Sequence, residues 1–210
     1  MLLTSPNTVL LNAGDELHLK YGQRSNTELF VEYGFVNELV DHGSDFPAEI
    51  SLDVDIQCVI EPMIRGLGVA RAQRMKELLK DEGYEGDWTI HLQPSPAHPS
   101  YRVTTCLRLY ALFAEHGPDT ILDTQAVKLW KDTLAGRRPC ISQRNEVAWR
   151  TVLRELCTGL IGEAQTASQQ TLTTKEGWER WAWRCVRALG AEMGMVARAV
   201  GESVDAGEEF

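Results

Sequence analysis

A chain of 210 residues is long enough for one large domain, or for a medium domain joined to part of another. Hydrophobic residues make up 43% of it and charged residues 24%, which is typical of a globular protein with a sizeable core. The formal net charge is -9, and because an acidic surface repels phosphate we expect neither nucleic acid nor a membrane as partner, while a basic protein segment is mildly favoured.

The first part of the chain is predicted to be rich in β-structure. Residues 16–21 alternate apolar and polar side chains, which is the period of a strand with one buried face. Residues 25–29 then offer a capping Ser or Asn with a glutamate in the first turn. This run predicts a short helix that ends near Tyr33 and Gly34.

A polar segment with glycine and proline, residues 41–48, follows, and we place a domain boundary there. Residues 49–56 alternate again and predict a strand or an extended lead-in, and residues 86–92 predict another short strand. Amphipathic spacing predicts helices over 71–80, 101–114, 119–134 and 143–162.

The longest apolar stripe follows a capping box formed by Thr173 and Glu176. Its members recur at helical spacing: Trp178, Trp181, Cys185, Leu189, Met193, Val196 and Val200. This spacing favours core packing of the two tryptophans over a binding groove. Trp149 and Trp183 fall outside the main stripes, and we predict that they make exposed contacts.

These elements predict a mainly α fold. A helical bundle is expected over residues 50–204, preceded by a small β-rich part over residues 1–42 and followed by an acidic tail over residues 205–210. We expect residues 50–204 to fold by themselves, because they can bury a shared core, whereas two or three uncovered strands are marginal in water.

The five cysteines are odd in number and show no Cys-x-x-Cys spacing, so we interpret them as free thiols in a reducing compartment. Neither they nor the histidines cluster as a zinc site requires, and no metal is expected. No window reaches the roughly 20 apolar residues of a membrane span. The first residues also lack a basic, apolar signal sequence, so we expect a cytoplasmic or nuclear location.

The most informative stretch is 12–38. It contains, in order, Gly-Asp-Glu at 14–16, Tyr-Gly at 21–22, Ser-Asn-x-Glu-Leu at 25–29 and Tyr-Gly-Phe at 33–35. This combination resembles the closing segment of SET-type protein methyltransferases. Its second half resembles the Rubisco lysine methyltransferase branch, in which the SET domain is followed by a helical substrate-binding domain.

The resemblance implies a C-terminal fragment of a SET domain in residues 1–42 and a Rubisco lysine methyltransferase-type substrate-binding domain in residues 50–204. It implies S-adenosylmethionine as cofactor and a protein with a target lysine as substrate. Tyr21 matches the catalytic tyrosine, whose hydroxyl orients the amine, while Tyr33 and Phe35 match residues that line the lysine channel. Such a channel must shed water and orient the amine, and aromatic faces favour the cationic lysine.

Simpler readings of the same residues stay open. A tyrosine at a strand end is usually a core or rim residue, and Tyr-Gly-Phe at 33–35 can simply pack a helix end. Asp15 and Glu16 are adjacent at a turn, where strand alternation points their side chains apart, so we assign them no catalytic role.

The sequence also departs from the family pattern. The family's Gly-x-Gly and Asn-His-Ser segments, which contribute to the methyl-donor site, do not occur in the expected places. We therefore expect this chain alone neither to bind S-adenosylmethionine nor to transfer methyl groups. The alternative is a non-catalytic protein-interaction module left by a truncated SET protein, and a histidine target in place of lysine also stays open.

Overall fold

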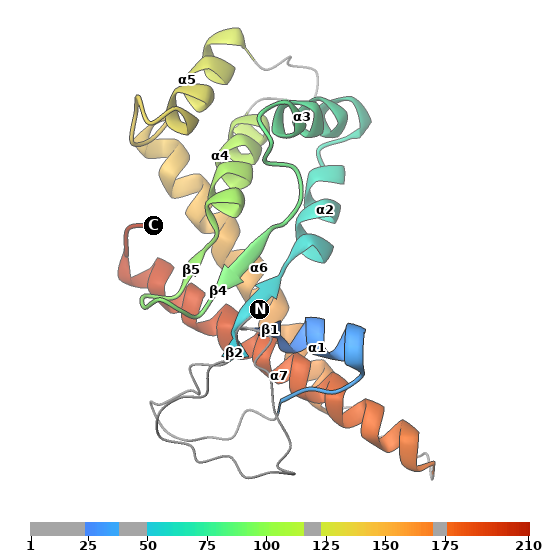
Figure 1. Ribbon diagram of the computed structural model, residues 1–210. Helices are drawn as coiled ribbons and strands as arrows, with labels where there is room; N and C mark the ends of the chain where they lie inside the picture. The colour runs from blue at the N-terminus through green and yellow to red at the C-terminus, as the bar shows by residue number, and fades with distance from the viewer. Residues whose placement is uncertain (1–23, 38–49, 116–122, 170–175) are drawn as a thin grey trace, which may run out of the picture.

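The computed structural model describes residues 24–37, 50–115, 123–169 and 176–210 (Figure 1). Helices dominate these residues, which confirms the predicted mainly α fold. The helices are α1 (Asn26–Tyr33), α2 (Gln57–Arg65), α3 (Val69–Asp81), α4 (Tyr101–Glu115), α5 (Thr124–Leu134), α6 (Gln143–Gln169) and α7 (Gly177–Ala206).

Five short strands accompany the helices: β1 (Arg24–Ser25), β2 (Ile50–Ser51), β3 (Asp53–Asp55), β4 (Thr89–His91) and β5 (His98–Pro99). The last three form an antiparallel sheet in the order β3-β4-β5, in which Val54 pairs with Ile90. β1 pairs with β2 in parallel. The strands predicted within residues 49–56 and 86–92 are confirmed.

The predicted helices are also found, with some differences in their bounds. The helix predicted over 119–134 begins only at Thr124, after Asp123 as its cap, and residues 119–122 lie outside the described residues. α3 extends the range 71–80 by a few residues, and α6 continues past the predicted end at Gly162 to Gln169. The capping box predicted at Thr173 lies outside the described residues, and α7 begins after Glu176.

The α6–α7 pair forms the centre of the fold. In Figure 1, α7 runs across the lower part of the molecule, and α1 and the strands β3, β4 and β5 lie against it. The two helices are antiparallel, because Gly194 faces Ala164 while Gly201 faces Cys157. Their buried residues join one core with those of α2, α3, α4 and β4, including Ile60, Met75, Ile90, Leu107, Leu153, Leu160, Val196 and Val200.

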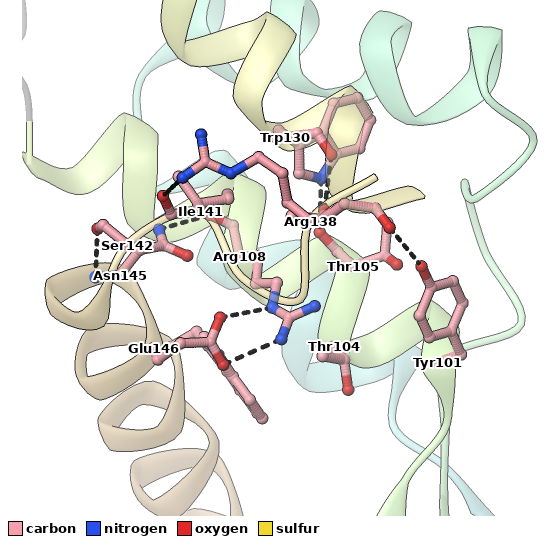
Figure 2. A network of polar contacts seen from close by, with 12 residues as sticks. Tyr101, Thr104, Thr105, Arg108, Trp130, Arg138, Ile141, Ser142, Asn145 and Glu146 are labelled. Atoms are coloured by element: carbon pink, nitrogen blue, oxygen red, sulfur yellow. Dashed lines mark hydrogen bonds and ion pairs between the residues drawn. The ribbon is translucent and has the colours of Figure 1, made fainter. Parts of the chain in front are cut away.

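The junction of α4, α5 and α6 is held by polar contacts (Figure 2). The Trp130 indole donates to the Thr105 carbonyl at 3.1 Å. Arg108 donates through Nε and Nη2 to the two carboxylate oxygens of Glu146, at 2.8 and 3.0 Å. The indole of Trp149 donates to the same carboxylate at 2.9 Å.

The position of Trp149 corrects one expectation from the sequence. We predicted an exposed tryptophan, but only 1% of Trp149 is exposed. The prediction was wrong because the indole N–H finds a carboxylate inside the fold, and the Arg108 guanidinium lies 5.8 Å from the ring centroid. These partners compensate the burial of the polar edge.

The approach of α7 to α6 depends on one glycine. A Cβ added at Gly194 would lie 2.8 Å from Ala164 Cβ, closer than packed carbon atoms approach. We therefore predict that Gly194→Ala destabilises the chain by about 1–3 kcal/mol in urea unfolding, as overpacking does.

The matched control is Gly201→Ala on the same helix. Its added Cβ would lie 3.8 Å from Cys157 Cβ, an ordinary contact. Helix propensity alone then predicts stabilisation by up to about 1 kcal/mol. Equal effects of the two substitutions would contradict a tight crossing at Gly194.

The Arg108–Glu146 pair yields a second stability prediction. Their side chains are 11% and 16% exposed, so removing one partner leaves the other charge poorly solvated. We expect Glu146→Ala to cost about 3–5 kcal/mol in the same measurement. Glu77→Ala removes an exposed pair with Arg74 and should change stability by less than about 1 kcal/mol. Similar losses at both sites would overturn the structural importance of the buried pair.

Candidate functional site

The described part of the motif segment, from residue 24 onward, folds as its residues predict, whereas the strand predicted over residues 16–21 lies outside the described residues. Ser25 caps α1: its Oγ accepts from the backbone N–H of Glu28, and the Glu28 carboxylate accepts from the Ser25 backbone N–H at 2.9 Å. α1 ends at Gly34, whose φ of 75° is left-handed and whose N–H donates to the Phe30 carbonyl. The predicted helix is confirmed, including its first and last turns.

The two aromatic residues of the motif lie exposed at the end of α1. Tyr33 is 56% exposed and Phe35 is 44% exposed, and their ring centroids are 6.3 Å apart. Their predicted place in a lysine channel stays a prediction. Tyr21 lies outside the described residues, so its catalytic role also stays a prediction.

Asn26 ties this segment to the rest of the fold. It is 1% exposed. Its Oδ1 accepts from the Asn37 backbone N–H at 2.8 Å, and its Nδ2 donates to the Asn37 carbonyl at 3.1 Å. Nδ2 also donates to Glu192 Oε2 on α7 at 2.7 Å. One amide therefore fixes both ends of the segment that carries Tyr33 and Phe35.

Glu192 is a buried carboxyl, with 3% exposure. Burial raises the pKa of Glu192, Asp53 on β3 raises it further, and the hydrogen bond from Asn26 opposes the shift. Sequence reasoning missed this contact. The available signal was a carboxylate directly beside Met193 in the apolar stripe, because an acid at the edge of a buried helix face needs a partner.

A groove of about 470 Å³ lies between the end of the motif segment and the first half of α7. Phe35 and Trp181 contribute aromatic surface to it, and Gly34 lies close to the Trp181 ring, since a Cβ there would be 3.8 Å from Cη2. The lining residues are Phe35, Val36, Ser168, Trp181, Arg184, Cys185, Arg187, Ala188 and Ala191.

The tryptophans at the start of α7 correct a further expectation. Helical spacing predicted that Trp178 and Trp181 pack in the core, but they are 68% and 45% exposed. Later members of the same stripe, such as Val196 and Val200, are fully buried. The stripe is real, but its first two members are exposed, whereas its members from Cys185 onward are buried or half-buried.

The described residues show no group of three or more His, Cys, Asp or Glu side chains placed to hold a metal ion. Within the same residues, no helix is long and apolar enough to cross a membrane. All five cysteines are free: Cys58 is exposed, Cys140 is half-buried, and Cys106, Cys157 and Cys185 are buried.

Two curated proteins are similar to this chain. SET domain-containing protein 4 from Mus musculus is 29% identical over 164 residues, which is 77% of this chain and 31% of that protein. The Homo sapiens protein of the same name is 27% identical over the same shares. The chain is related to SET-domain proteins. It spans less than a third of the length of these relatives.

No protein-family profile matches the chain, and no solved structure matches it. The similarity to SET domain-containing protein 4 therefore carries the relationship. It agrees with the resemblance of residues 12–38 to the closing segment of SET methyltransferases.

The raised pKa of Glu192 predicts a pH effect on stability. A carboxyl with a raised folded-state pKa stays protonated longer in the native chain than in the unfolded chain. The stability that this carboxyl contributes is fully present below its pKa in the unfolded chain. That stability is lost as the pH rises through its pKa in the folded chain. Glu192→Gln keeps an acceptor for Asn26 without the charge, so its stability relative to the wild type should increase as the pH rises from about 4 to 7.

The measurement is urea unfolding of both chains across that pH range. Glu202→Gln, at an exposed position on the same helix, is the control and should not show this trend. A constant difference between Glu192→Gln and wild type would contradict the burial of an ionisable group at this contact.

Proposed function

We propose that this chain is the C-terminal portion of an S-adenosylmethionine-dependent protein-lysine N-methyltransferase of the cytoplasm or nucleus. In this proposal residues 50–204 are a Rubisco lysine methyltransferase-type domain that docks the protein substrate. One observation carries it: the segment that resembles the SET closing motif is folded against α7 by Asn26 and Glu192, with two aromatic rings exposed at its end. The similarity to SET domain-containing protein 4 supports it.

The proposed chemistry assigns each motif residue a task. The Tyr21 hydroxyl orients the target amine. Tyr33 and Phe35 present ring faces to the lysine side chain, because aromatic faces attract a cationic ammonium and their apolar edges exclude water. The helical domain contributes by holding the substrate so that the amine is correctly oriented for transfer.

The described residues do not themselves fit S-adenosylmethionine. The ligand carries a positive sulfonium, and the groove beside the motif is lined by the cationic side chains of Arg184 and Arg187. We therefore place no cofactor in this groove and derive no step through it. In this proposal the methyl donor binds to other parts of a longer protein, as the greater length of the relatives allows.

The proposal is tested at Tyr21 in a longer protein that carries this segment and transfers methyl groups. Tyr21→Phe removes one hydroxyl and little volume. If that hydroxyl orients the amine, turnover should fall by about two orders of magnitude, the scale found when a preorganised polar group is deleted. Tyr84→Phe, which alters a half-buried tyrosine between α3 and β4, is the control and should leave turnover unchanged. Full activity of Tyr21→Phe would contradict the proposed role.

The second candidate is a non-catalytic protein-interaction module. The exposed aromatic residues around the α7 groove favour it, because an apolar patch on a protein surface commonly marks a binding site. The two candidates differ in methyl transfer. A longer protein that binds its partner but transfers no methyl group from S-adenosylmethionine would support the module.

A further inference from the structure

The first half of α7 combines exposed tryptophans with arginines. Trp178 and Trp181 are exposed, and Arg180, Arg184 and Arg187 follow each other at spacings of four and three residues. Such spacing places the three arginines along one side of a helix. α1 packs against this helix (Figure 1), so Phe35 lies at the edge of the same surface.

The charge of this surface is opposite to that of the whole chain. The protein carries a formal net charge of -9. Between Trp178 and Ala191, however, the three arginines are accompanied by a single acid, Glu179. Within the described part of the chain, Arg187 forms no ion pair, and this side chain lines the groove. A local basic face on an acidic protein favours an acidic partner.

The lining and the volume of the groove also favour a partner with an apolar side chain. Its lining includes small residues of α7, namely Cys185, Ala188 and Ala191, and Phe35 and Trp181 add aromatic surface. A volume of about 470 Å³ accommodates a large apolar side chain with its neighbouring backbone. Aromatic residues and arginine are also the types most often found at the energetic centre of protein interfaces.

We propose that this groove docks an extended acidic segment of another protein, with one large apolar side chain in the groove and a carboxylate against Arg187. Arginine suits this task because its planar guanidinium can bind a carboxylate through two parallel hydrogen bonds. The proposal deepens the proposed function and rests on it in one respect: the partner is then the protein that receives the methyl group.

Nucleic acid is a less suitable occupant. Tryptophan and arginine can stack on bases, but the net charge of -9 opposes a phosphate backbone that extends beyond the groove. A second copy of this chain would also bring acidic residues to the arginines. Both occupants are outcomes of the test below.

The test uses the full chain and a fluorescein-labelled peptide in which glutamates flank a central Phe-Leu pair. Fluorescence anisotropy should show binding that weakens as the salt concentration rises, because exposed charge pairs are screened. Replacing the glutamates by lysine, or the Phe-Leu pair by alanine, should abolish binding. Arg187→Glu and Trp181→Ala should each weaken binding by about tenfold.

The control is Arg198→Glu, an exposed charge reversal on the same helix outside the groove lining, which should leave affinity unchanged. Circular dichroism checks that every variant is folded. The proposal is overturned if the full chain does not bind the peptide, or if Arg198→Glu weakens binding as much as Arg187→Glu. It is also overturned if a single-stranded oligonucleotide binds more tightly than the peptide.

Self-association is tested by sedimentation of the chain at increasing concentration. Assembly that is abolished by Arg187→Glu would assign the groove to a second copy and overturn the proposal. Peptide binding needs no methyl transfer, so the two proposals fail separately. If the chain does not bind the peptide but Tyr21→Phe is inactive, only the proposed docking site is wrong. If the chain binds the peptide but Tyr21→Phe is active, only the proposed catalytic role of Tyr21 is wrong.

Discussion

The close approach of α7 to α6 at Gly194 is the constraint on which the rest of the structure depends. Gly194 lets the two helices approach so closely that a methyl group there would meet Ala164. Through this contact α7 is held at a fixed distance from the bundle. α1 and the strands β3, β4 and β5 pack against α7 in turn. The position of the motif segment is therefore set by the packing of two helices more than a hundred residues away in the sequence.

α7 serves two purposes along its length. Its second half buries Val196, Ala197 and Val200 in the common core, and this half supplies the apolar burial that stabilises the bundle. Its first half leaves Trp178 and Trp181 exposed next to arginines. Two large exposed rings do not contribute the stability that they would contribute if they were buried. The first half of α7 is therefore the part of the helix best suited to bind another molecule.

The sequence predicted the elements that depend on local interactions. The capping box of Ser25 and Glu28 and the left-handed Gly34 define α1 within a few residues, and both features can be identified from the sequence alone. The alternation in residues 49–56 and the amphipathic spacing of the later helices are local signals of the same kind. The predictions that the described structure confirms are therefore those that depend on interactions between residues close together in the sequence.

The errors arose where burial depends on distant partners. Periodicity shows which face of a helix is apolar, but it does not show whether another element covers that face, and Trp178 and Trp181 were assigned to the core for this reason. The prediction for Trp149 was wrong in the opposite direction. It lies off the apolar stripe, yet it is buried because Glu146 accepts from its indole and Arg108 lies near its ring. Glu146 lies three residues away on the same helix, but Arg108 lies on α4, and spacing along α6 does not show that α4 covers this side of the helix.

The contact between Asn26 and Glu192 joins a residue that a local motif identifies to a partner that is distant in the sequence. Asn26 belongs to a motif that the sequence identifies, but its partner lies 166 residues further along the chain. The amide is fully engaged: it holds Asn37 through two hydrogen bonds and Glu192 through a third. Asn26 thus has a structural role, because its side chain is buried and engaged within the protein. The directions of Tyr33 and Phe35 therefore depend on α7, and a change in the packing of α7 would move both rings.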